Sequence, residues 1–321
     1  MMLNKSASRA SLVALAICGA FLTGCDKQAV TASPASGGSA PGASPTRDAA
    51  NAQAKVKNTY MTTYNRLIDD NRSLAAIFKS YQRLQVQSKS PSATSFYGDP
   101  ATFDALFKTL KEARTGGSGD ASLDTAVDRL LASGEKLLAV WAPLHPYYNS
   151  QGFLSDHYAK ARAEDARMTT AFAGVLTEID RLGHELDRVE DDKRADDMAK
   201  LKEHGEMARY YSVETMALAK KFMGALQDVG GGKRQEATAR ADALITELEA
   251  SMENYRQAIA AKPADASESA QKAAKANLNV QSKLQSMIGQ WRVFSTSKSP
   301  SAITGRNIVG YYNDAVNASS H

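Results

Sequence analysis

Cysteine is scarce in this chain of 321 residues: there are two, Cys18 and Cys25, and both lie within the first 25 positions. The rest of the chain has no thiol, so it can form no disulfide, no cysteine-ligated metal centre and no thiolate nucleophile. A disulfide-stabilised scaffold is therefore excluded, and burial of ordinary apolar side chains must stabilise the fold.

The chain also lacks an excess of charge of one sign and the short motifs that mark common enzymes. It has 39 basic and 35 acidic residues, a balance that argues against a nucleic-acid partner, because such binding rests on neutralising phosphates. No Gly-x-Ser-x-Gly, His-Glu-x-x-His or phosphate-binding glycine loop occurs. We therefore assign no catalytic residue and expect no cofactor.

The N-terminus has the organisation of a secretory signal. Lys5 and Arg9 precede an apolar run over residues 11–21, which is too short to span a bilayer as a stable helix. The run ends in Leu22-Thr23-Gly24-Cys25, which resembles the bacterial lipobox. This pattern predicts a signal peptide at residues 1–24, cleavage between Gly24 and Cys25, and a diacylglycerol thioether on Cys25.

A lipid anchor predicts a cell-envelope protein that faces the periplasm and has the membrane as its first partner. Asp26 directly follows the anchor and resembles the signal that retains some lipoproteins in the inner membrane, so it favours that membrane. Residues 25–52 are rich in Ser, Ala, Gly and Pro and cannot bury enough apolar surface to offset the entropy of ordering. They predict a disordered tether with a reach of roughly 25–30 Å, which leaves residues 53–321 as the folded domain.

After residue 55, apolar residues recur with helical spacing almost without interruption. No stretch shows the sustained alternation that marks a strand, so the predicted fold class is all-α. Because short connections favour antiparallel neighbours, we predict a single domain, an elongated antiparallel bundle of about seven helices. Segments rich in Gly or containing Pro separate the helical stripes, at residues 90–91, 116–119, 145–146, 230–232 and 262–263.

One connection has no such breaker. A helix running from residue 156 to residue 228 would be roughly 110 Å long at 1.5 Å per residue, which is too long for a compact bundle. Residues 190–197 contain no Gly or Pro but eight consecutive residues of which seven are charged. We therefore predict that the chain reverses near residues 190–197.

Two polar residues, Asn71 and Asp165, stand on otherwise apolar helical stripes. Polar residues at such positions usually fix the register of neighbouring helices, and less often they line an internal polar site. Both interpretations are open at this point.

One segment of six residues occurs twice, once at residues 88–93 and again at residues 297–302, as Ser-Lys-Ser-Pro-Ser-Ala. Each copy follows a long predicted helix, and a lysine followed by Ser-Pro is ordinary chemistry for ending a helix. The alternative is that Lys89 and Lys298, with their neighbouring hydroxyls, bind an anion such as a phosphate or an acidic glycan.

His184 and His204 are the one pair of histidines with a geometric argument for metal binding. If the chain reverses near residue 194, they lie at equal distances from the turn and face each other beside acidic residues. The alternative is that both are solvated on charged helix faces.

Tyrosine doublets occur at residues 147–148, 210–211 and 311–312. Neighbours on a helix point about 100° apart, so one ring of a doublet is buried while the other lies at the rim. An aromatic platform for a sugar or a peptide is the alternative, and it makes Tyr148 a candidate binding residue.

Three short patches resemble the YiiG-like family of bacterial lipoproteins, and together they bracket residues 55–317. They are Tyr64-Asn65-x-Leu67-Ile68, then Tyr147-Tyr148 through Phe153, Asp156 and Ala159-Lys160, and finally Tyr312-Asn313-x-x-Val316-Asn317. The resemblance implies a helical envelope lipoprotein and brings no established activity or catalytic residue. Asp156, which we take as a further candidate binding residue, is followed by His157 rather than by a second acid.

Two functions from different classes follow. The first is a non-enzymatic binding or scaffold module for an unknown protein or envelope ligand, favoured by the anchor, the tether and the missing catalytic motifs. The second is a hydrolase acting on envelope polymers through carboxylates near residues 145–165, such as Asp156, Glu164 or Asp165. Glycoside cleavage needs two such carboxylates across a cleft, which a sequence does not show.

Overall fold

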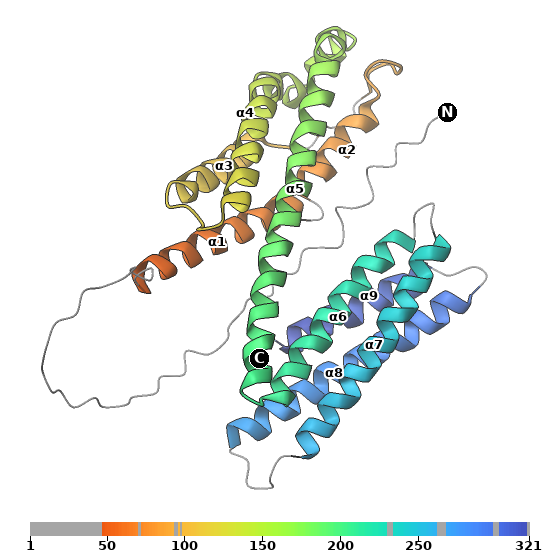
Figure 1. Ribbon diagram of the computed structural model, residues 1–321. Coiled ribbons are helices and arrows are strands. Elements are labelled where there is room, and N and C mark those ends of the chain that lie inside the picture. The colour runs from red at the N-terminus through yellow and green to blue at the C-terminus, as the bar shows by residue number, and fades with distance from the viewer. Residues whose placement is uncertain are drawn as a thin grey trace, which may run out of the picture. The chain divides into compact units, whose positions relative to one another are not determined.

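The computed structural model describes residues 47–69, 72–92, 96, 98–229, 234–261, 268–297 and 302–319 (Figure 1). In these ranges the regular structure is entirely helical, which confirms the all-α prediction. The elements are α1 Arg47–Ile68, α2 Leu74–Leu84, α3 Pro100–Arg114, α4 Ala121–Asn149, the short 3-10 helix η1 Gly152–Leu154, α5 Ala159–Glu203, α6 Met207–Val229, α7 Arg234–Ala260, α8 Glu268–Thr296 and α9 Ala302–Ser319.

The helices pack as two compact units, and the boundary between them follows Glu190, within α5. Unit 1 contains α1 to α4, η1 and α5 up to that residue, and unit 2 contains the remainder of α5 and α6 to α9. Each unit buries apolar side chains of its own. Helix α1 begins at Arg47, so the last six residues of the predicted tether, 47–52, are helical.

In unit 1, short polar side chains determine where three helices begin. The side chains of Ser73, Asp99 and Asp120 accept hydrogen bonds from the first backbone N–H groups of α2, α3 and α4. The helices then bury aromatic side chains against one another, with Trp141 and Phe172 fully buried. Their rings lie 5.5 Å apart, so α4 and α5 meet through aromatic contacts.

In unit 2, α6 packs along α7 and α8 packs along α9, as two antiparallel hairpins. The core is mostly aliphatic around Phe222 and Trp291, and it includes one buried pair of hydroxyls, Thr215 and Ser251, whose oxygens are 3.0 Å apart. A hydroxyl pair of this kind satisfies both groups without a charged partner.

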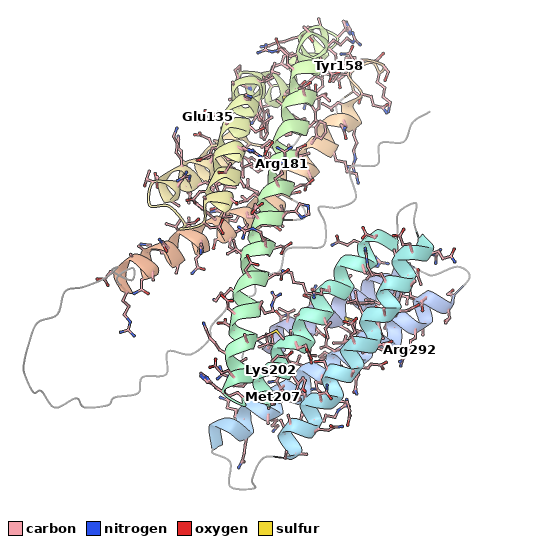
Figure 2. The ribbon with its side chains drawn as sticks, in the orientation of Figure 1. Glu135, Tyr158, Arg181, Lys202, Met207 and Arg292 are labelled. Carbon is pink, nitrogen blue, oxygen red and sulfur yellow. The ribbon has the colours of Figure 1, made fainter. Side chains whose placement is uncertain are left out.

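The predicted turn near residues 190–197 is wrong. Helix α5 continues through this segment to Glu203, and the chain reverses only at Gly205 (Figure 2, where Lys202 and Met207 mark the two sides). The segment contains no Gly or Pro to break the helix, and Arg194 pairs with Asp191 one turn away. The true stop is a Schellman cap: Gly205 has a φ of 68°, and the N–H of Glu206 donates to the carbonyl of Leu201.

Two further predicted boundaries differ. Helix α4 continues past Pro143 and Pro146 to Asn149, so the prolines do not end it. The first predicted stripe is divided into α1 and α2 between Ile68 and Leu74, and Asn71 lies outside the described residues. In the described ranges, no helix has a stretch apolar and long enough to cross a bilayer.

Candidate binding site at the α4–α5 corner

Several residues singled out from the sequence come together in unit 1, where α4 ends and α5 begins. We call this region the α4–α5 corner, and Figure 2 labels one of its members, Tyr158, at the start of α5. The corner comprises Tyr81, Gln87, Tyr147, Tyr148, Phe153, Asp156, Tyr158, Arg162 and Asp165.

Asp156 fixes the start of α5. Its carboxylate accepts a hydrogen bond from the Tyr147 hydroxyl at 2.8 Å and another from the backbone N–H of Lys160 at 3.0 Å. Burial acts to raise the pKa of Asp156, but these hydrogen bonds outweigh it and hold the pKa below its ordinary value. The Lys160 ammonium lies 5.4 Å from the centre of the Tyr147 ring, a cation–π contact on the same side chain.

Asp165 joins three segments of unit 1. Its carboxylate accepts from the Tyr81 hydroxyl of α2 at 2.7 Å and from the Gln87 side-chain amide at 3.0 Å. Burial raises the pKa of Tyr81 well above its ordinary value, and the neighbouring Tyr148 and Asp165 act in the same direction. Tyr81 therefore stays protonated and donates to Asp165. Asp165, the polar residue on an apolar stripe, thus fixes the contact between α2 and α5.

Arg162 holds the loop after α2 against the corner. Its guanidinium donates to three backbone carbonyls, those of Val86 at 2.8 Å, His157 at 2.9 Å and Lys89 at 3.4 Å. The Lys89 segment is thus brought to the same corner as Asp156 and Tyr148. The Lys89 side chain itself is exposed, and Lys298 lies outside the described residues.

Tyr148 is the buried member of its doublet, 4% exposed, whereas Tyr147 is half-buried at the rim, as predicted. The Tyr148 ring meets those of Tyr81 and Phe96 edge-on. Its hydroxyl makes no hydrogen bond of good geometry, although the Tyr81 hydroxyl is close enough for each to influence the pKa of the other. Burial raises the pKa of Tyr148 to about 12.

The backbone of the corner is strained. In the described ranges, every residue other than glycine with a positive φ belongs to this corner or to the loop held against it: Gln85 (47°), Gln151 (56°), His157 (52°) and Tyr158 (67°). Tyr158 is 1% exposed and stacks on Phe153 at 5.2 Å, so packing of its ring holds the unfavourable backbone in place. Sequence reasoning missed this feature because none of the four is Gly or Asn.

The structure does not support a metal site formed by His184 and His204, because α5 continues through the predicted turn that would have brought them face to face. Both side chains are exposed, and α5 continues from His184 to the residue before His204. In the part of the chain that the structure describes, no group of three or more His, Cys, Asp or Glu side chains is placed to hold a metal ion.

Comparison with known proteins gives one match. No curated protein and no solved structure matches the chain. The model of a family described as "Protein of unknown function (DUF3829)" matches residues 53–310, which span both helical units. Because this match covers most of the chain, the protein belongs to the DUF3829 family.

Proposed function

We propose that this protein is a lipid-anchored lipoprotein of the bacterial cell envelope, close to the YiiG-like lipoproteins, that binds a protein or envelope ligand without catalysing a reaction. The anchor is supported by the lipobox-like Leu22-Thr23-Gly24-Cys25 after a short apolar run. These residues precede the described part of the chain. The domain then faces the periplasm, with Asp26 favouring the inner membrane.

Intact-mass analysis of the protein recovered from membranes tests the anchor. We expect a chain that begins at Cys25 and carries the added mass of acyl chains, and we expect Cys25→Ser to abolish both the cleavage and the added mass. An unmodified Cys25, or a full-length chain in the cytosol, would contradict the anchor. Separation of inner from outer membranes in the same preparation tests the role of Asp26, with Asp26→Ser as the variant.

The binding role rests on the α4–α5 corner. One observation carries it: the segment that joins α4 to α5 has strained backbone at Gln151, His157 and Tyr158, and the last turn of α4 before it holds a buried Tyr148 hydroxyl without a well-formed hydrogen bond. Each residue in such a conformation costs on the order of 1 kcal/mol, and strain of this kind gathers at ligand sites. Leu154, in the middle of the strained segment, is 40% exposed and offers an apolar contact at the surface.

The hydrogen bonds of the carboxylates favour binding over hydrolysis. A general acid needs a raised pKa, but hydrogen bonds hold the pKa of Asp156 below its ordinary value, so it is ionised at neutral pH. Glu164 pairs with Arg167 at 2.8 Å, and Asp165 is engaged by Tyr81 and Gln87. In this arrangement the carboxylates position neighbouring groups, which suits a binding surface.

A photo-crosslinking side chain at position 154, introduced in intact cells, tests this role. We expect a defined crosslinked product from position 154 and none from position 136, since Lys136 is also an exposed residue but lies in α4 away from the corner. Asp156→Asn in the same background should reduce the product, because it weakens the bond from Tyr147 and loosens the start of α5.

Equal products from both positions, or a product that Asp156→Asn leaves unchanged, would contradict a site at the corner. Mass spectrometry of the crosslinked fragment then distinguishes a protein partner from a glycan or other envelope polymer.

A further inference from the structure

The core of unit 2 contains a group of polar side chains toward the end where α6 begins and α7 ends. We call this group the polar layer, and its members are Ser212, Thr215, Ser251, Asn277 and Gln281. They come from α6, α7 and α8, and three of them, Thr215, Ser251 and Gln281, are at most 4% exposed. The core of a helical bundle is ordinarily apolar, so these buried groups call for an explanation.

Two hydrogen bonds fix the positions of the members relative to one another. The Ser212 hydroxyl donates to the Asn277 side-chain carbonyl at 2.7 Å, and the hydroxyl oxygens of Thr215 and Ser251 are 3.0 Å apart. Helices α6 and α8 each run antiparallel to α7, so they point in the same direction (Figure 1). Thr215 lies about one turn beyond Ser212, and Gln281 lies about one turn beyond Asn277. Gln281 is therefore level with the pair of Thr215 and Ser251.

Gln281 differs from the other members of the polar layer. Its carbonyl oxygen is buried and accepts no hydrogen bond from the described part of the chain. A buried acceptor without a donor destabilises the fold, because it has lost its hydrogen bond to water and gained none in return. An apolar side chain of the same size would fill the position without this loss. Glutamine at position 281 is therefore unfavourable for stability alone, as is typical of a residue that binds a ligand.

The polar layer reaches the surface between the two hairpins of unit 2. The helices within each hairpin pack closely, whereas contacts between the hairpins are sparser. Ser212 and Asn277 join the hairpins at this end and are only half-buried. An aromatic contact between the hairpins, from Phe222 to Trp291, lies farther along the bundle. The polar end is thus where the hairpins can separate with little loss of apolar packing.

The chemistry of the polar layer suits an uncharged ligand. Its hydroxyl and amide groups carry no charge and can both donate and accept hydrogen bonds. Tyr255, which is hydrogen-bonded to Asn277, is also neutral, because burial raises its pKa above the ordinary value. A charged ligand would find no opposite charge among these side chains, and burial of an unpaired charge is costly. A sugar carries several hydroxyls that donate and accept at once, which matches this set of groups.

We propose that unit 2 binds a neutral sugar at the polar layer, where a hydroxyl or amide N–H of the ligand donates to the carbonyl oxygen of Gln281 and where Ser212 and Asn277 line the entrance. The α4–α5 corner belongs to unit 1, so this is a second site, and it does not depend on the lipid anchor. A single water molecule is the alternative donor to Gln281, and it predicts that no sugar binds.

Calorimetric titration of the purified full-length chain with glucose and with N-acetylglucosamine tests the proposal. We expect at least one of the two sugars to bind with a Kd of roughly 1 mM or lower. We expect glucose 6-phosphate to bind at least roughly tenfold more weakly, because its charge has no partner in the polar layer.

Gln281→Met is the decisive variant, because methionine has a similar volume but no amide. It should weaken sugar binding at least roughly tenfold and also raise the midpoint of thermal unfolding, because it removes an unpaired buried acceptor. Gln285→Met is the matched control: Gln285 is exposed one turn farther along α8, and its substitution should leave binding unchanged. Thr215→Val with Ser251→Ala, which removes both hydroxyls of a bonded pair, should weaken binding while the chain stays folded.

Absence of binding by both sugars would overturn the proposal. Sugar binding that Gln281→Met leaves intact, or that Gln285→Met weakens to the same extent, would also overturn it, as would glucose 6-phosphate that binds as tightly as glucose. Helicity by circular dichroism verifies that each variant is folded. Crosslinking at position 154 reports on unit 1, so failure of sugar binding is distinguishable from failure of the α4–α5 corner.

Discussion

Unit 1 and unit 2 are both built from packed helices, but they differ in how their aromatic groups and glycines are used. In unit 1, Trp141 contacts three phenylalanines, whereas in unit 2 the rings that meet Trp291 are those of Phe222 and Phe294. A Cβ at the helical Gly134 of unit 1 would strike a packed ring, while one at Gly289 of unit 2 would meet open space. The packing at Gly134 in unit 1 therefore leaves no room for a larger side chain, whereas Gly289 in unit 2 does.

The largest expected effect separates the two cores. Phe172→Ala should destabilise unit 1 by about 3–5 kcal/mol, because its ring is fully buried among Phe78, Tyr81 and Trp141. Phe222→Ala should destabilise unit 2 by less, since its described ring contact is with Trp291. The chain has two tryptophans, one in each unit, so denaturation of Trp291→Phe and Trp141→Phe backgrounds reports each unit separately. Transitions that always shift together would show that the units unfold as one.

The second-largest expected effect is a loss of stability of unit 1 at alkaline pH. Burial raises the pKa of Tyr148 to about 12, so the folded state favours the protonated phenol. This stabilisation is complete below pH 10, the ordinary pKa, and is lost as the pH rises through 12, to an extent of about 2–3 kcal/mol. Tyr148→Phe should remove this part of the alkaline loss. Fluorescence of Trp141 during denaturation at several pH values measures it, and an unchanged pH dependence in the variant would refute the assignment.

Alanine in place of glycine should have opposite signs in the two units. At Gly134 the added methyl would lie 2.7 Å from the Phe107 ring, which is itself buried, so we expect a loss of about 1–3 kcal/mol. At Gly289 nothing lies within 4 Å of the added atom, so Gly289→Ala should stabilise α8 by about 0.5–1 kcal/mol. Thermal denaturation of the two variants measures both changes in stability. Two losses of equal size would contradict the difference between the units.

The smallest effect concerns the left-handed backbone positions. Gln151 in unit 1 has a φ of 56°, and Gly205 in unit 2 has a φ of 68°. Gln151→Gly should relieve strain, and Gly205→Gln should introduce it, each by about 0.5–1 kcal/mol. We expect the relief in unit 1 to be accompanied by weaker crosslinking at position 154. If Gln151→Gly raises the stability but leaves crosslinking at position 154 unchanged, the strained backbone is not needed for binding.

Much of the fold could be predicted because helical periodicity is a local property. The stripe through Met168, Phe172, Val175 and Ile179 is buried as its spacing requires. The predicted position of the reversal after α5 is wrong, because a charged run can continue a helix, whereas Gly205 eight residues beyond it is the residue type that ends one. Periodicity also does not show which stripes share a core, so it carries no information on how the helices group into two compact units.

The sequence predicts individual residues of the candidate site but not the contacts that bring them together. Tyr148, Asp156 and the Lys89 loop are each candidates from the sequence, but nothing local to them indicates that Arg162 joins the Lys89 loop to His157, next to Asp156, through backbone carbonyls. The sequence also does not predict the positive φ angles of His157 and Tyr158. Neither residue favours this conformation by itself, and at Tyr158 the stacking of its ring on Phe153 holds the backbone there.

Arg162 joins the loop after α2 to the start of α5 through main-chain atoms alone. Three N–H groups of its guanidinium donate to the carbonyl oxygens of Val86, His157 and Lys89, and the rigid planar shape of this group lets one side chain reach several acceptors. Because every acceptor is a backbone carbonyl, a substitution at residue 86, 89 or 157 leaves the acceptor in place. The connection therefore depends on a single side chain, that of Arg162.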